Sequence, residues 1–374
     1  MKARLTPAQW LAHPPKTITE HLLRSGLSLL SVPYSAITWT RGMMYDHRIF
    51  PVHRLSCPVI CIGNITTGGT GKTPIVRYVA ELLRDEGQTV AILSRGYKRP
   101  DGKGPLLVRD QEAIRASWRT AGDEPLLLAQ NLSGVVLLVG SNRWETGQIA
   151  IKDYQADIIV LDDGFSHRQL FRDLDFVLLD VTNPFGYGRM LPSGLLREPV
   201  SAIERAEAVI LTRTRPGETY PELEHTLLKY HIHKPIFRFI SHLGPIRDAR
   251  TNESIPFSRI PSPLLAFSGI GNPVGFNNTL TDLDLTPVQT LSYPDHYTYQ
   301  PADWAELNQL AKKYGAKGLF TTEKDVIKLK DYISDSDLPL MYPELRMEPE
   351  DKAAFSQFIQ QRISLKNQAS LNML

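Results

Sequence analysis

The stretch Val59–Thr73, VICIGNITTGGTGKT, runs from an apolar segment through a glycine-rich turn into a segment with helical periodicity. This is the strand-turn-helix context of a phosphate-binding loop. Glycines let backbone amides converge on phosphate oxygens, and the following helix directs its positive end toward them. We therefore expect a nucleotide to be bound by Thr66, Thr67, Gly68, Gly69, Thr70, Gly71, Lys72 and Thr73.

The residue types in this loop predict ATP as the ligand and Mg²⁺ as its counterion. Lys72 is expected to reach the outer phosphates, and the Thr73 hydroxyl is expected to ligate Mg²⁺. One position departs from the G-x-x-x-x-G-K-[ST] pattern, because Thr66 stands where the first glycine belongs. Gly68 and Gly69 can supply the missing flexibility. A Rossmann dinucleotide site is disfavoured, since a Lys-Thr pair has no place in that fingerprint.

A second acidic element is the expected partner of this loop. The segment 157–164, DIIVLDDG, carries four apolar residues directly into Asp162 and Asp163. This is the form of a Walker B element, whose carboxylate helps to hold Mg²⁺. Buried strands also end in acidic turns for structural reasons, so the prediction depends on the phosphate-binding loop in the same chain. Asp180 is a competing candidate that we rank lower, because it opens a turn.

The hydrophobic pattern around these motifs predicts an α/β fold. Short apolar runs alternate with longer helical stretches, which is typical of a parallel sheet with crossover helices. Strands are expected at 59–63, 89–93, 135–139, 157–161, 176–179 and 208–212, and helices at 72–85, 124–131 and 142–154. The Gly- and Pro-rich segment 183–199 predicts a mobile loop or hairpin near the site.

A second series of apolar runs predicts a smaller α/β domain. Its strands are expected at 236–240, 264–267, 286–291, 318–321 and 338–341, with a final helix at about 350–363. We therefore expect a helical segment at 1–50, a P-loop NTPase-like α/β/α domain at 51–205, a smaller domain at 206–345 and a C-terminal helix and tail at 346–374.

Composition limits the kinds of partner and compartment. The formal charge of +2 gives no global field that would attract nucleic acid. The only cysteines, Cys57 and Cys61, form neither a disulfide framework nor a zinc site, and a reducing cytosolic setting suits them. Nothing in the sequence indicates an obligatory protein partner.

The N-terminal region contains an uncharged run, Ser25–Thr40, that is too short for a comfortable membrane span. It also lacks the features of a cleaved signal peptide. Its leucines and aromatic residues can form one side of a helix that lies in a lipid interface, or they can pack on the protein's own core. Pro33 is expected to bend or end this helix.

The ordered motifs together resemble one family. They are GGTGKTP at 68–74, SRGY at 94–97, GDEP at 122–125, LDDGFSHRQL at 161–170, LPSGLLREP at 191–199, SGIGNP at 268–273, PDHYTY at 294–299 and TTEKD at 321–325. The chain resembles the tetraacyldisaccharide 4'-kinases, the lipid A 4'-kinases of Gram-negative bacteria. Such a resemblance also makes Thr66 a family trait rather than a defect.

The resemblance implies a fold, a reaction and a location. It implies two hinged α/β/α layers and a membrane-associated N-terminal helix at the cytoplasmic face of the inner membrane. It further implies that ATP phosphorylates the 4'-hydroxyl of a tetraacylated glucosamine disaccharide 1-phosphate to form lipid IV-A. A four-chain lipid leaves a bilayer reluctantly, so this substrate favours membrane contact for the N-terminal helix.

Family resemblance also implies roles for residues whose types alone leave the matter open. Asp123 precedes an expected helix, where capping the helix is as reasonable a role as catalysis. The local sequence alone favours a turn position for His296. The resemblance maps a catalytic pair onto Asp123, as the base, and His296, as its partner from the second domain. It leaves Arg95, Tyr97 and Arg197 as weaker candidates for binding substrate or phosphate. Glu124 and His167 lie beside these elements without an assigned step.

Two other classes of function remain as alternatives. A P-loop GTPase, ATPase switch or chaperone would need no lipid acceptor, but the guanine-specifying Asn-Lys-x-Asp segment is absent from the sequence. A non-enzymatic lipid-binding protein would not need Lys72, Thr73 and Asp162, all of which are present.

Overall fold

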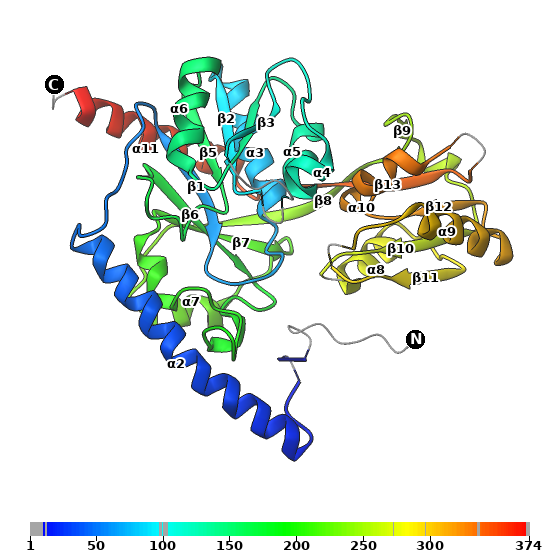
Figure 1. Ribbon diagram of the computed structural model, residues 1–374, viewed down its shortest axis with the longest axis horizontal. Helices are drawn as coiled ribbons and strands as arrows, with labels where there is room; N and C mark the ends of the chain where they lie inside the picture. The colour runs from blue at the N-terminus through cyan, green and yellow to red at the C-terminus, as the bar shows by residue number, and fades with distance from the viewer. Residues whose placement is uncertain are drawn as a thin grey trace.

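A computed structural model describes residues 10–11, 13–96, 99, 104–271, 273–295, 297–334 and 337–371. One mixed sheet runs through the molecule in the order β11-β10-β12-β13-β8-β7-β6-β1-β5-β2-β4-β3, with β9 paired to β8. Figure 1 shows two lobes on this sheet, joined by the long strands β8 and β13. The first lobe contains β1 to β7, and the second contains β10, β11 and β12. The described strands are β1 (Val59–Asn64), β2 (Val90–Ser94), β3 (Leu106–Arg109), β4 (Val136–Val139), β5 (Ile158–Asp162), β6 (Leu174–Asp180), β7 (Ala208–Thr214), β8 (Ile236–Asp248), β9 (Ser254–Ile255), β10 (Leu264–Ser268), β11 (Gln289–Ser292), β12 (Gly318–Phe320) and β13 (Leu340–Pro349).

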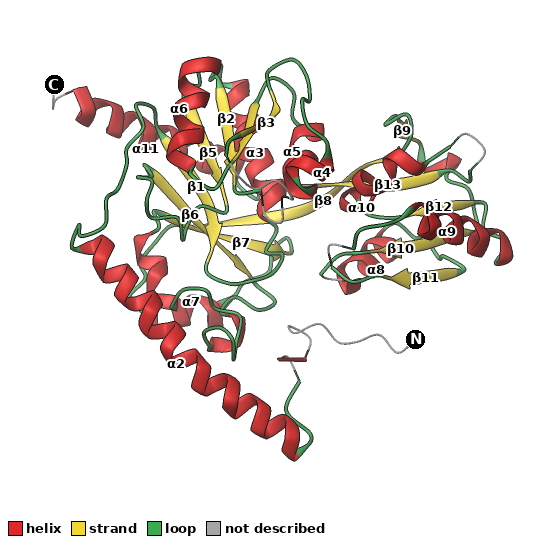
Figure 2. Ribbon diagram, in the orientation of Figure 1, coloured by secondary structure: helices red, strands yellow, loops and turns green. Residues whose placement is uncertain are grey.

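Helices cover the sheet, as the secondary-structure colouring of Figure 2 makes clear. The described α-helices are α2 (Ile18–Asp46), α3 (Lys72–Asp85), α4 (Trp118–Ala121), α5 (Asp123–Asn131), α6 (Arg143–Tyr154), α7 (Pro221–Lys229), α8 (Pro273–Asp282), α9 (Pro301–Lys313), α10 (Glu323–Leu329) and α11 (Lys352–Leu371). Short 3₁₀ segments lie at Gly186–Gly188, Val200–Arg205, Phe257–Arg259 and Lys330–Tyr332. The alternation of strands and crossover helices confirms the α/β fold expected from the sequence.

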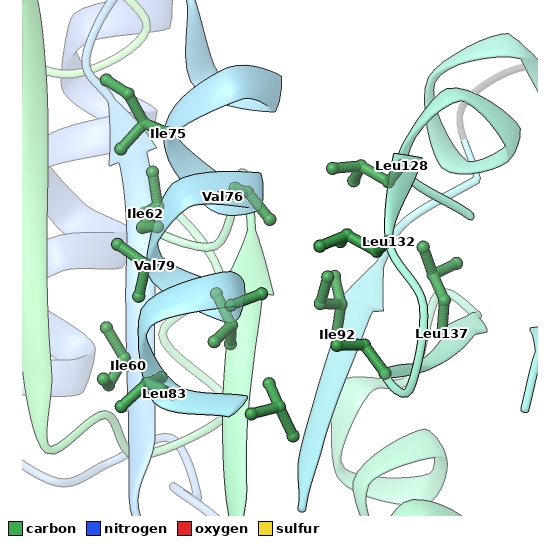
Figure 3. Close-up of a cluster of buried hydrophobic side chains, with 14 of the residues drawn as sticks. Ile60, Ile62, Ile75, Val76, Val79, Leu83, Ile92, Leu128, Leu132 and Leu137 are labelled. Atoms are coloured by element: carbon green, nitrogen blue, oxygen red, sulfur yellow. The ribbon is translucent and has the colours of Figure 1, made fainter. Parts of the chain in front are cut away.

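The core of the first lobe explains why α3 is helical at this place. Its buried side chains recur at helical spacing and face the apolar residues of β1 and β2 (Figure 3). The helix contributes Ile75, Val76, Val79 and Leu83, and the strands contribute Ile60, Ile62 and Ile92. Burial of an aliphatic side chain contributes about 1.5–3 kcal/mol. This packing fixes the start of α3, and with it Lys72, at the carboxyl end of β1.

The second lobe has its own parallel strands and its own core. β10 pairs with β11 and β12 in parallel, and β13 pairs antiparallel with β8. α11 returns to the first lobe, where Phe355 and Phe358 pack against Phe176 and Phe237. Leu223 and Leu227 of α7 lie in the same buried cluster as residues of β1 and β6, and the limit expected at residue 206 falls between β6 and α7.

Pro33 was expected to bend or end the N-terminal helix, and α2 does not end there. The helix continues through this proline to Asp46, and a capping box of Thr17 and Glu20 begins it. Side-chain hydroxyls bond to backbone carbonyls on both sides of the proline, since Ser31 donates to Leu27 and Ser35 donates to Ser31. Among the described residues, no helix combines the length and apolar character needed to cross a membrane.

The remaining differences concern strand lengths. Most expected strands and helices lie within a few residues of their observed limits, but β8 and β13 extend well beyond the expected 236–240 and 338–341. Their extensions mix buried, half-buried and exposed residues as they cross between the lobes, so they lack a continuous apolar run. The edge strand β3 was not expected.

Candidate functional site

The phosphate-binding loop lies between β1 and α3, as the sequence predicts. Gly71 precedes α3 with φ of 82°, a left-handed conformation that any side chain would strain, and a Cβ there would also meet Met347. Thr66 instead forms an extended bridge with Leu196, and the Thr67 amide donates to the Leu195 carbonyl at 2.8 Å. Because the chain is extended at Thr66, a β-branched residue is accommodated where the motif has glycine.

Asn64, the last residue of β1, connects the parts of the loop. It is fully buried, and its amide Nδ2 donates to the hydroxyls of Thr66 and Thr70 at 3.3 and 3.0 Å. Its Oδ1 accepts from Lys72 Nζ at 3.3 Å and also from the Arg197 guanidinium. One amide side chain therefore orients the lysine of the loop.

The acidic pair that ends β5 lies beside this lysine. Arg197 makes a bidentate contact with Asp163, at 2.7 and 3.0 Å, and Lys72 Nζ lies 3.8 Å from the same carboxylate. Burial opposes the charge of Asp163, but Lys72 and Arg197 outweigh this effect and lower its pKa to about 2. Asp163 is therefore a carboxylate throughout the physiological range.

Asp162 has the opposite electrostatic character. Burial, together with the negative charges of Glu124 and Asp163, raises its pKa to about 7. Ser94 at the end of β2 donates to its Oδ2 at 2.9 Å and orients it. Thr73, Asp162 and Asp163 offer only oxygen donors, which is the donor chemistry that Mg²⁺ prefers. Asp180, the competing candidate, is paired with Arg213, whose other nitrogen donates to the Gly69 carbonyl.

Asp123 begins α5 in the first lobe and faces residues of the second lobe. Lys328 of α10 places its Nζ 3.3 Å from Asp123 Oδ2, while Lys324 lies 3.9 Å from that oxygen and 3.1 Å from Glu124 Oε1. The negative charge of Glu124 contributes to the raised pKa of Asp162, so this contact lies near the acidic pair that ends β5. His296, the expected partner of Asp123, lies outside the described residues.

The weaker candidates fall on both sides of the site. Arg95 follows β2 and is exposed, and Tyr97 lies outside the described residues. Arg197 contacts Asn64 at the end of β1 and Asp163 after β5. His167 follows β5, and burial together with nearby arginines, first Arg143, lowers its pKa to about 4. It is therefore neutral at physiological pH.

The Gly- and Pro-rich segment 183–199 lies against the phosphate-binding loop, as expected. It also meets α2, because Ser31 hydrogen bonds to Ser193 at 2.8 Å and the Tyr34 hydroxyl donates to the Arg197 carbonyl at 3.1 Å. The N-terminal helix is thus in contact with the same segment that supplies Arg197 to the site.

A family model described as tetraacyldisaccharide-1-P 4'-kinase matches residues 23–364. The chain belongs to this family. Relatives named tetraacyldisaccharide 4'-kinase include one from Syntrophus aciditrophicus, 38% identical over 346 residues that cover 89% of this chain and 91% of the relative. Another, from Aquifex aeolicus, is 36% identical over 83% of this chain and 91% of the relative.

A solved structure agrees with the observed fold. The crystal structure of LpxK from Aquifex aeolicus, described as an "apo" form in complex with ATP, superimposes with a TM-score of 0.75 at 32% sequence identity. The match covers 91% of this chain and 99% of that one. Both lobes of the present chain therefore have counterparts in the tetraacyldisaccharide 4'-kinases.

Some residues of the site were missed by sequence reasoning. Asn64 carried one available signal, a polar residue that ends an otherwise apolar strand immediately before the loop. Lys324 lies within the TTEKD motif, but nothing local indicated a contact with Glu124, which is 200 residues away. Lys328 follows the motif and had no signal, since a lysine on a helix is usually solvated.

Proposed function

We infer that this protein is an ATP-dependent kinase that phosphorylates the 4'-hydroxyl of a tetraacylated glucosamine disaccharide 1-phosphate, forming lipid IV-A in lipid A biosynthesis. The observation that carries this inference is the complete phosphate-binding loop beside the acidic pair, in a chain of the tetraacyldisaccharide-1-P 4'-kinase family. Phosphoryl transfer depends mainly on alignment and charge neutralisation, and this site supplies both.

Nucleotide binding is assigned to the loop residues 66–73. Their backbone amides surround the phosphates, and Lys72, which Asn64 and Asp163 hold at the loop, neutralises the outer phosphates. When ATP binds, Arg197 is placed to exchange part of its contact with Asp163 for a phosphate oxygen. Arg95 and Tyr97 are assigned to the edge of the acceptor site.

The metal site is assigned to Thr73, Asp162 and Asp163. Bound Mg²⁺ would neutralise charge that develops on the transferring phosphoryl group. The protein's own part is to keep Asp163 ionised through Lys72 and Arg197, and to orient Asp162 through Ser94. Both carboxylates are thus held in place independently of one another.

Removal of the proton from the acceptor hydroxyl is assigned to Asp123. A carboxylate can remove this proton as transfer proceeds, and His296 from the second lobe would orient the carboxylate or tune its charge. Because Asp123 and α10 come from different lobes, the base would be complete only when the lobes are docked.

The acceptor's location is assigned to the cytoplasmic face of the inner membrane. A substrate with four acyl chains stays in the bilayer, so the enzyme has to reach it there. The α2 helix exposes Leu22, Leu29 and Ile37, while its opposite side contacts the segment that carries Arg197. Lipid contact by α2 would therefore place the site next to the headgroup region.

Transfer of label from radioactive ATP to the purified lipid disaccharide, followed by thin-layer chromatography, tests this function. The wild-type protein should give a labelled product that depends on the acceptor. Lys72→Ala should lower product formation by orders of magnitude while the thermal unfolding midpoint is retained. Nucleotide hydrolysis at a similar rate with and without the lipid, with no labelled lipid, would instead support an ATPase or GTPase switch.

A further inference from the structure

A contact between the two lobes joins the expected base to a buried lysine. Figure 1 shows α10 of the second lobe beside α4 and α5 of the first. Lys328 on α10 is 2% exposed, and its Nζ lies 3.3 Å from Asp123 Oδ2. Lysine is strongly hydrated, so a buried lysine needs an opposing charge. Asp123 provides that charge across the lobe boundary.

The surroundings of Lys328 hold its end of the contact in place. Asp325, one turn earlier, is fully buried and accepts from the Gly269 amide, the Tyr299 hydroxyl and the Thr322 hydroxyl. These donors come from the SGIGNP, PDHYTY and TTEKD motifs, to which the proposed reaction gives no direct part beyond His296. Three separate motifs therefore converge on the helical turn that presents Lys328.

Docking of the lobes does not depend on Lys328 alone. Arg119 of α4 pairs with Asp331 at 2.7 Å, and Asn131 of α5 donates to Glu323 at 3.0 Å. These contacts set the position of α10 against α4 and α5 at both ends of the interface. The lobes therefore do not need the Lys328 ammonium to hold them together, and its contact with Asp123 can serve the site.

We propose that Lys328 is a positioning residue for Asp123: its ammonium, presented by the second lobe, holds the carboxylate in place and in its charged form, ready to accept the hydroxyl proton. This inference rests on the phosphoryl transfer proposed above. Lys328 itself touches neither substrate nor nucleotide in this role. Because Lys328 belongs to the second lobe, Asp123 can act as a base only when that lobe is docked on the first.

Several charged groups surround Asp123, and they determine the expected pH effect. The cations are Lys324 and Lys328 from α10, and the acidic groups are Glu124 on α5, Asp325 on α10 and Asp295 near Lys324. An ammonium at 3.3 Å favours the carboxylate, so its removal should raise the pKa of Asp123. The base would then be protonated over a wider acidic range.

The test compares Lys328→Met, Lys328→Arg and the control Lys330→Met, which removes the same charge from an exposed position. We expect Lys328→Met to move the acidic limb of the kcat profile upward by about one pH unit, so that the loss of kcat is largest at acidic pH. KM for ATP should change little, and much of the lost activity should return at high pH. Lys328→Arg should restore part of the activity, and Lys330→Met should behave as wild type.

A second measurement needs no acceptor and separates this proposal from the reaction itself. Carbon-13 NMR of labelled aspartate, with Asp123→Asn to assign the signal, should show a higher pKa for Asp123 in Lys328→Met than in the wild type. If the wild type phosphorylates no lipid, the proposed reaction fails, and this titration still decides the positioning role. The proposal is overturned if the titration does not move, or if kcat falls equally at every pH together with the thermal midpoint.

Discussion

Asn64 ends a strand, but its side chain also positions residues of the phosphate-binding loop. Its amide donates to two buried threonine hydroxyls, and its oxygen accepts from Lys72 and Arg197. An aspartate here would repeat the acceptor but not the donors. The asparagine is therefore suited to link neutral hydroxyls on one side with cations on the other.

Asn64→Ala should impair catalysis more than folding. Without the amide, Thr66 and Thr70 lose their buried partner and Lys72 keeps only the longer contact with Asp163. Because a misplacement of about 1 Å can cost roughly 10²-fold, we expect kcat/KM for ATP to fall by about that factor. Steady-state kinetics with varied ATP measures this effect.

A matched control removes an amide from the surface. Asn278→Ala changes an exposed residue of α8 and should leave kcat/KM for ATP as in the wild type. Equal kinetics for Asn64→Ala and Asn278→Ala would contradict the role assigned to Asn64.

At the level of elements, α2 has two unlike sides. The side that faces the first lobe includes Ser31, Tyr34 and Tyr45, which recur at helical spacing, and the first two make contacts with the segment 183–199. Around much of the rest of its circumference the helix exposes large apolar residues, among them Ile18, Leu22, Leu23, Leu29, Leu30, Val32, Ile37 and Trp39. So many exposed apolar residues on one helix are unusual for a surface in contact with water alone.

Charges on the exposed apolar side of α2 should weaken membrane binding. The variant Leu22→Glu, Leu29→Glu, Ile37→Glu places carboxylates where we expect contact with acyl chains. It should remain with the soluble fraction when vesicles of bacterial phospholipid are sedimented, whereas the wild type should sediment with them. Activity toward the lipid disaccharide in vesicles should fall, but activity toward detergent-solubilised disaccharide should fall less.

The control for this experiment carries the same added charge. Asn278→Glu, Thr281→Glu, Gln309→Glu changes exposed polar positions of α8 and α9, away from α2. If both triple variants lose vesicle binding to the same extent, general repulsion from anionic lipid explains the effect. If neither loses binding, the membrane contact assigned to α2 is wrong.

At the scale of the whole molecule, the two lobes meet through buried charged groups. Glu344 on β13 is 1% exposed and contacts Arg77 of α3, Arg247 of β8 and Arg346 of its own strand. Burial alone would raise its pKa, but the arginines outweigh this effect and lower it. This cluster ties both long strands to the helix that follows the phosphate-binding loop.

Glu323 makes the stability of the folded protein depend on pH. It lies between the lobes, accepts from Asn131 and from the Leu345 amide, and lines a cavity of about 70 Å³ with Thr73 and Arg77. Burial raises its pKa from 4.5 to about 7. Between these values the folded protein binds more protons than the unfolded chain, so stability falls as pH rises through this window.

Glu323→Gln should remove this pH dependence while the oxygen that accepts from Asn131 is kept. The quantity to compare is the thermal unfolding midpoint of the variant minus that of the wild type. This difference should be more positive at pH 8 than at pH 5. Glu204→Gln, at an exposed position, serves as the control and should show no such change. A difference between Glu323→Gln and wild type that is the same at both pH values would contradict the assignment.

The sequence alone determined the elements and the chemistry that belong to neighbouring residues. The strand, the glycine-rich loop and the helix from Val59 to Asp85 follow from apolar periodicity and glycine placement, which act over a few residues. The acidic pair at the end of β5 could be predicted for the same reason. The ordered motifs also sufficed to identify the family.

Tertiary structure alone decided which distant residues meet. Arg197 reaches Asn64 across 133 residues, and Lys328 reaches Asp123 across the lobe boundary. On α2, Ser31 and Tyr34 likewise donate to the carbonyls of Met190 and Arg197 in the segment 183–199. Such pairings depend on strand order, on the register of β8 with β13 and on helix docking. Local periodicity cannot encode them, because each arises only when separate parts of the chain bury their apolar faces together.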